Sequence, residues 1–165
     1  MLKYLQEKKC YMDEAVLIEA AKAGKLAVVQ WGRKDARIWW SSEVASAAAG
    51  GGHLETLRWI REQGCPWYSS TCEEAARGGH LHILKWVRGK NCPWDQQTCN
   101  LAAFNGHLKV LKWLHENGCP WTDNTCTAAA EGGRLEVLNY LVENGCLCNE
   151  SIGERTAQRG HLGVL

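Results

Sequence analysis

Nine cysteines stand among the 165 residues, and convergent thiols could hold a metal ion. A zinc site usually takes its thiols from Cys-x2-Cys pairs, and the sequence has none; Cys146 and Cys148 enclose a single residue. A step of 27 residues instead relates one series: Cys65, Cys92, Cys119 and Cys146. A small residue that returns at a fixed interval indicates a repeated packing position. We therefore predict buried structural cysteines and no metal site.

Histidine is the second candidate for chemistry, as a general acid or base. Four histidines precede a leucine at equivalent places: His53, His80, His107 and His161. A catalytic histidine acts at one place beside a specific neighbour, so one histidine per interval indicates capping or hydrogen bonding between repeats. The sequence also shows no Ser/His/Asp arrangement and no glycine-rich phosphate loop. We therefore predict a protein that is not an enzyme and takes no cofactor.

Nine tryptophans could stack the bases of a single-stranded nucleic acid. They form two series, Trp67, Trp94 and Trp121 after Cys-Pro, and Trp59, Trp86 and Trp113 upstream. Positive charge is interleaved at Arg58, Lys85 and Lys112, but that series continues as Asn139 and the C-terminal third is rich in glutamate. The formal net charge is only +1. The alternative is that the first series braces the turns and the second completes the core, and we expect no nucleic-acid partner.

A 27-residue repeat positions all of these residues, and each unit reads as two helices. In one unit Asp95 caps the first helix, Gly106 ends it and the second helix starts near His107. Gly118 then takes the left-handed conformation that follows a helix, as do Gly64, Asn91 and Gly145 in other units. One extra residue lies in a predicted loop over 32–37. We expect an all-α array of stacked helix pairs over 1–165, with full units at 10–37, 38–64, 65–91, 92–118 and 119–145 and partial units at 1–9 and 146–165.

The order Thr-Cys-x-x-Ala-Ala-x-x-Gly-His-Leu, followed by an apolar helix and Asn-Gly, resembles the ankyrin repeat. Thr71-Cys72 and its equivalents stand where that family has Thr-Pro, and a tight Cys-Pro-Trp turn replaces the projecting finger. The resemblance is to a divergent, short, Cys/Trp-rich form and covers nearly the whole chain. It implies a helix-turn-helix solenoid with a general protein-binding role, and it names no partner.

The composition narrows the setting. The longest apolar runs are too short for a membrane span, so no membrane insertion is expected. The segment from Met1 to Cys10 lacks the apolar core of a secretory signal, and an odd cysteine count prevents complete pairing. These features predict free thiols and an intracellular, reducing compartment, with the cytoplasm as the first choice.

Positions that vary between units are the candidates for partner contact, because packing does not fix them. Phe104 stands out as the only phenylalanine, at a position that is otherwise small, polar or charged. Exposed aromatic residues often anchor interfaces; the alternative for Phe104 is a packed variant of a semi-buried position. The predicted contact residues are Tyr68, Glu73, Arg77, Asp95, Asn100, Phe104, Thr122 and Glu131.

We therefore expect a protein–protein interaction scaffold that uses the first helices and the turns. The first alternative is a structural subunit that braces a larger assembly through many weak contacts. A single-stranded nucleic-acid binder is the second. Neither end shows a polar capping unit, which predicts either a piece of a longer array or ends covered by another component.

Overall fold

A computed structural model describes residues 13–147, and every regular element in this range is a helix. The predicted all-α class is therefore confirmed for the described residues. The ten helices are α2 (Glu14–Lys22), α3 (Leu26–Lys34), α4 (Ser42–Gly50), α5 (Leu54–Glu62), α6 (Ser69–Arg77), α7 (Leu81–Gly89), α8 (Gln96–Asn105), α9 (Leu108–Glu116), α10 (Asp123–Glu131) and α11 (Leu135–Glu143). None of these ten is long and apolar enough to cross a bilayer. The predicted partial unit at 1–9, and nearly all of the one at 146–165, lie outside the described residues.

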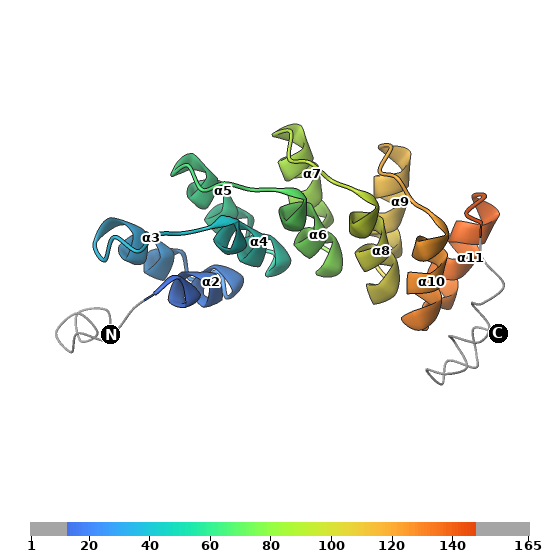
Figure 1. The fold of residues 1–165 in the computed structure, drawn as a ribbon, viewed down its shortest axis with the longest axis horizontal. Coiled ribbons are helices and arrows are strands. Elements are labelled where there is room, and N and C mark those ends of the chain that lie inside the picture. The colour runs from blue at the N-terminus through green and yellow to red at the C-terminus, as the bar shows by residue number, and fades with distance from the viewer. Residues whose placement is uncertain (1–12, 148–165) are drawn as a thin grey trace.

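The helices form pairs that follow one another along an arc (Figure 1). We call α2, α4, α6, α8 and α10 the first helices and α3, α5, α7, α9 and α11 the second helices. Neighbouring first helices contact each other extensively, whereas neighbouring second helices touch at few points. The array therefore curves, and the first helices lie on its inner side.

Small residues let the first helices approach so closely. The Ala-Ala pairs are fully buried in α4, α6, α8 and α10 and nearly so in α2. After α4, a Cβ added to Gly51 would overlap the carbonyl oxygen of Lys22 on the preceding first helix. At Gly132 an added Cβ would likewise overlap the carbonyl oxygen of Phe104. Backbone therefore packs on backbone along this row, which only glycine and alanine permit.

The helix ends match the sequence pattern. The Asp95 carboxylate accepts a hydrogen bond from the Gln97 N–H at 2.9 Å, and Gly106 closes α8 with φ of 81°. The predicted left-handed residues after the second helices are all confirmed, with φ of 81° at Gly64, 59° at Asn91, 76° at Gly118 and 80° at Gly145. Asparagine enters this region more cheaply than other side-chain-bearing residues, which explains its use at the one non-glycine position of these four.

The predicted loop over 32–37 is partly wrong, because α3 continues to Lys34. Arg37 takes the left-handed conformation there, with φ of 54°. The Ile38 N–H bonds to the carbonyl of Gly32, six residues earlier, at 2.9 Å, whereas the equivalent bond in the next unit, from Cys65 to Ile60, spans five residues. This wider turn accommodates the extra residue without disturbing the next unit.

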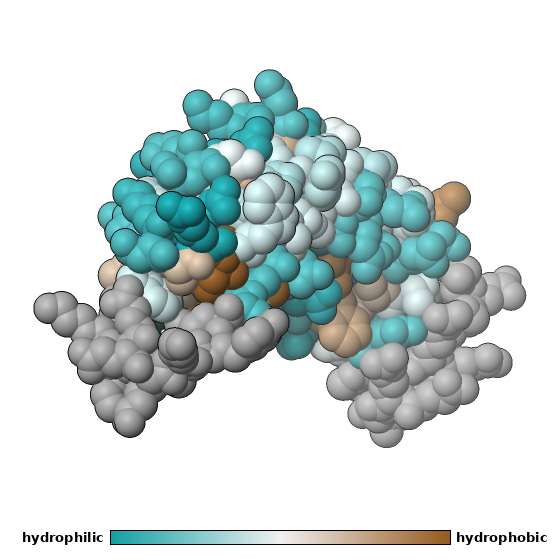
Figure 2. Space-filling model, turned by 60° about the vertical axis from the view of Figure 1, so that its left-hand side comes forward, coloured by the Kyte–Doolittle hydropathy of each residue, from teal (hydrophilic) through white to brown (hydrophobic). Residues whose placement is uncertain are grey.

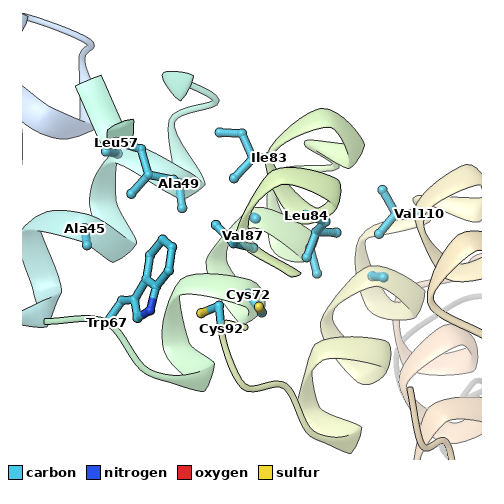
Figure 3. Packing of buried hydrophobic residues seen from close by; sticks show 14 of the residues in the cluster. Ala45, Ala49, Leu57, Trp67, Cys72, Ile83, Leu84, Val87, Cys92 and Val110 are labelled. Carbon is cyan, nitrogen blue, oxygen red and sulfur yellow. The ribbon is translucent and has the colours of Figure 1, made fainter. Parts of the chain in front are cut away.

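The core runs through every helix pair as one continuous cluster. Figure 3 shows Ile83, Leu84 and Val87 of α7 lying between side chains of the neighbouring units. Each turn tryptophan meets the second-helix tryptophan of its own unit edge to face, or Tyr140 in the case of Trp121. The Trp67 and Trp86 ring centroids are 5.6 Å apart at an angle of 77°. Such pairs contribute about 0.5–1.5 kcal/mol beyond their buried area.

An arginine at the end of the preceding second helix covers each of two turn tryptophans. Arg61 lies 4.5 Å from the centroid of the Trp67 ring, and Arg88 lies 3.9 Å from that of Trp94. The same guanidinium groups donate to the Cys65 and Cys92 carbonyls at 3.0 and 2.7 Å. His115 takes this place at Trp121, stacked at 3.7 Å. The predicted bracing role of the turn tryptophans is thus confirmed, and their ring faces are used by side chains of the chain itself.

The histidine series joins consecutive units. The His80 imidazole bonds to the Gly50 carbonyl at 3.0 Å, and the His107 imidazole to the Arg77 carbonyl at 2.9 Å. Arg134 occupies the same place in the next unit and donates to the Phe104 carbonyl at 3.0 Å. The predicted inter-repeat hydrogen bond is therefore confirmed at these histidines.

We expect Trp67→Ala to lower the free energy of unfolding by about 3–5 kcal/mol, because it removes a large side chain from a well-packed site. The Trp67 side chain is only 8% exposed. Urea denaturation followed by circular dichroism measures the change. Trp39→Ala is the matched control, since Trp39 is 78% exposed, and its effect should stay within ~0.5 kcal/mol. Equal effects of the two substitutions would contradict this packing scheme.

A second prediction concerns pH. Burial lowers the pKa of His80 below its ordinary value, as do His82, His107 and His53 nearby, while the bond to Gly50 opposes the change. The imidazole of His80 therefore binds a proton more readily in the unfolded chain than in the folded chain. The stability that neutral His80 contributes is complete above a pH of about 6.5. It is lost as the pH falls from there through the lower pKa of the folded chain. His80→Arg, which copies Arg134 of a later unit, should keep the bond and make Tm depend less on pH below about 7. An unchanged slope of Tm against pH would show that His80 does not carry this effect.

Candidate functional site

The cysteines act as buried packing groups and weak donors. Four thiols donate to the backbone carbonyl of the residue that precedes the first helix of the preceding unit: Cys65 to Ser41 at 3.2 Å, Cys92 to Tyr68 at 3.4 Å, Cys119 to Asp95 at 3.3 Å and Cys146 to Thr122 at 3.2 Å. Burial raises the pKa of the Cys65 thiol to about 11. A hydrogen bond donated to a neighbouring thiol, followed by burial, raises the pKa of Cys72 and of Cys119, while the bond from Cys72 lowers the pKa of Cys92. Protonated, buried thiols are poor nucleophiles and poor metal ligands.

Six of the described cysteines carry free thiols, as expected, whereas Cys126 is disulfide-bonded. Within residues 13–147 no group of three or more His, Cys, Asp or Glu side chains is placed to hold a metal ion. The sequence-based expectation of a structural role for the free cysteines agrees with their complete or nearly complete burial.

One series of positions that vary between units, Ser41, Tyr68, Asp95 and Thr122, occupies the N-cap positions of the first helices. Asp95 caps α8 and Thr122 caps α10, each accepting a backbone N–H with its side chain, and Ser41 does the same for α4. Capping therefore explains the residue types at Asp95 and Thr122 without any partner. Tyr68 is the exception, because its side chain makes no cap at α6 and is 60% exposed.

A hydroxyl pairing between neighbouring first helices explains a second variable series. Thr125 donates to the Asn100 side-chain oxygen at 2.7 Å, and Thr71 lies 3.4 Å from the Ser46 hydroxyl. Between these two interfaces, the equivalent pair would be Thr98 and Glu73. The Thr98 hydroxyl is fully buried and has no hydrogen-bond partner there, so Glu73 does not make the bond that its position offers.

The remaining variable positions, Gly50, Arg77, Phe104 and Glu131, lie at the C-terminal ends of the first helices. Side chains of the next unit bond to the backbone carbonyls of Gly50, Arg77 and Phe104. Arg77 forms an ion pair with Glu74 at 3.1 Å, and Phe104 is 37% exposed. Glu131 is the equivalent residue of α10.

All eight predicted contact residues therefore lie on the first helices or at their N-caps. They do not form one cluster: Tyr68, Asp95 and Thr122 lie at the starts of α6, α8 and α10, and Arg77, Phe104 and Glu131 near their ends. A nine-residue helix is about 13 Å long, which separates the two rows. Helix α6 carries three of the eight, Tyr68, Glu73 and Arg77, and two of these three forgo a stabilising bond of the repeat.

A groove of about 590 Å³ runs across the inner face of α2, α4 and α6. Charged residues line it, together with a floor that includes Ala47, Gly50 and Gly78. Sequence reasoning identified only Arg77 among its lining residues as a contact candidate. The remaining lining residues are Ile18, Glu19, Lys22, Glu43, Ser46, Ser70 and Glu74. The sequence of α4 contains a signal for the groove, namely its small residues. Ser46, Ala47 and Gly50 of α4 line the groove.

We expect two exchanges that copy the neighbouring units to stabilise the protein. Tyr68→Asp should supply the missing cap of α6, and Glu73→Asn should give Thr98 the acceptor that Asn100 gives Thr125, each adding about 1 kcal/mol. Chemical denaturation of each variant measures the gain. The reverse exchanges, Asp95→Tyr and Asn100→Glu, are matched controls and should each lose stability. If Tyr68→Asp and Glu73→Asn both destabilise the fold, these positions serve packing and the argument for a functional role fails.

No model of a known protein family matches the chain, and no curated protein matches it. Any function assigned to the chain therefore depends on its own residues and geometry.

Proposed function

We propose that the chain is an ankyrin-type solenoid that binds another protein through its first helices and their turns. The observation that carries the proposal is the pair Tyr68 and Glu73. Both stand where other units place a residue that stabilises the fold, and neither makes that bond. Residues that break a structural rule without a structural gain are characteristic of functional positions.

The neighbouring residues support the same surface. At Arg77 and Phe104 the next unit bonds to the backbone carbonyl, which any residue type offers. A partly exposed phenylalanine, with an arginine at the equivalent position of the neighbouring first helix, fits the composition of protein interfaces. The tryptophans offer less to a nucleic acid, because the chain's own cations cover the faces of Trp67 and Trp94. We therefore propose a protein partner ahead of a single-stranded nucleic acid.

A brace within a larger assembly is the second candidate. It is favoured by the exposure of Leu135, Val142 and Leu147 near the end of the described residues. We propose a binding rather than a catalytic role in either case, since the described histidines at 80 and 107 are engaged by carbonyls. Six free thiols favour a reducing, intracellular location such as the cytoplasm, which we propose although Cys126 is disulfide-bonded.

The proposal predicts that a few anchors carry most of the binding energy. A partner is first captured from native lysate and identified by mass spectrometry, and its affinity is then measured by calorimetry. Arg77→Ala together with Phe104→Ala should weaken binding by at least about tenfold, or 1.4 kcal/mol. Arg58→Ala with Lys85→Ala on the second helices is the control and should change the affinity little. Unchanged affinity in the first variant contradicts the recognition role and favours the brace.

A further inference from the structure

Charge is divided between the two rows of helices. The first-helix layer comprises residues 13–23, 41–51, 68–78, 95–105 and 122–132, and it holds nine Asp or Glu against two Lys or Arg, a net charge of −7. The second-helix layer comprises residues 24–40, 52–67, 79–94, 106–121 and 133–147, and it holds twelve Lys or Arg against six Asp or Glu, a net charge of +6. The net charge of the described residues is therefore −1, although negative and positive charges are separated between the two layers.

The near-neutral total is thus no guide to the partner. A net charge confined to one side attracts ligands of the opposite sign to that side. Figure 2 shows a largely hydrophilic surface in which apolar side chains form only small patches. The inner, acidic layer is also the layer that carries the groove across α2, α4 and α6.

The groove itself carries uncompensated carboxylates. Arg77 is already paired with Glu74 at 3.1 Å. Of the other three charged lining residues, Glu19 and Glu43 are acidic and only Lys22 is basic. Neither Glu19 nor Glu43 forms an ion pair with another described residue, so these two carboxylates are open to a partner.

The floor of the groove suits a long aliphatic stem. Ala47, Gly50 and Gly78 leave room, and most of the exposed lining is apolar. The floor cannot easily be raised, since a Cβ on Gly50 would lie 3.3 Å from Glu74 and one on Gly78 would lie 2.7 Å from the Gly50 carbonyl oxygen. Lysine and arginine combine a stem that covers apolar surface with a charged head that reaches a carboxylate at the rim. A groove of this volume holds several such side chains.

We propose that this groove binds an extended segment of a partner protein that carries lysine or arginine side chains, with their heads at Glu19 and Glu43. The proposal rests on the proposed function and adds the chemistry of the partner. An acidic segment or a nucleic-acid backbone would meet net repulsion on this face.

The test uses two fluorescein-labelled twelve-residue peptides, one of alternating Arg and Ala and the other of alternating Glu and Ala. Fluorescence anisotropy measures their binding to the full chain at about 50 and 300 mM NaCl. The Arg peptide should bind, and should bind more weakly at high salt because surface charges are screened. The Glu peptide should bind at least about tenfold more weakly than the Arg peptide. No binding of the Arg peptide, or a preference for the Glu peptide or for a single-stranded oligonucleotide, overturns the proposal.

Variants with the same change in charge locate the site. Glu19→Lys with Glu43→Lys should weaken binding of the Arg peptide by at least about tenfold. Glu55→Lys with Glu62→Lys on α5 is the control, because both residues are exposed in the second-helix layer, and it should change binding less than about twofold. Equal losses would mean attraction to the overall charge alone and would overturn the proposal. If the captured partner still depends on Arg77 and Phe104 while the Arg peptide fails to bind, only the groove chemistry is wrong; loss of both results removes the proposed function as well.

Discussion

Close approach of neighbouring first helices is the constraint on which the rest of this structure depends. The carbonyl oxygens of Lys22 and Phe104 lie where a Cβ at Gly51 or Gly132 would have to be. Such contact between backbones requires glycine and alanine, whereas the second helices carry leucine, valine and tryptophan and stay further apart. Because the first helices pack more closely than the second helices, the array curves and its inner surface consists of first helices. Without the close packing of the first helices there would be neither a concave layer nor a groove.

The same constraint separates the residues of each unit by task. Buried cysteines and histidine-to-carbonyl bonds hold consecutive units together and use backbone carbonyls as their partners, while the tryptophan pairs brace each unit internally. Exposed positions of the first helices take little part in these bonds and can carry other side chains. Tyr68 and Glu73 take that freedom furthest, since each occupies a position where the fold would gain from another residue. Stability that a fold forgoes at a particular place is an indication of selection for another property.

Much of this could be predicted from one sequence because every unit repeats the same local solution. The left-handed residues, the cap at Asp95 and the linking role of the histidines follow from spacing and residue type. The spacing also locates the extra residue of the first unit, but α3 extends further than expected, and a six-residue hydrogen bond from Ile38 to Gly32 accommodates the insertion. The side-chain contacts between units could not be predicted from spacing and residue type. The missing partner of Thr98 depends on how adjacent helices are registered, and the groove depends on side chains from three helices meeting in space.

The central claim is that a partner contacts the first helices rather than the second. Hydrogen–deuterium exchange of the chain, alone and saturated with its captured partner, tests this claim most directly, because it reports protection helix by helix. The account predicts that amides of α4 and α6 become more protected while those of α5 and α7 change little. Protection confined to the second helices would contradict it.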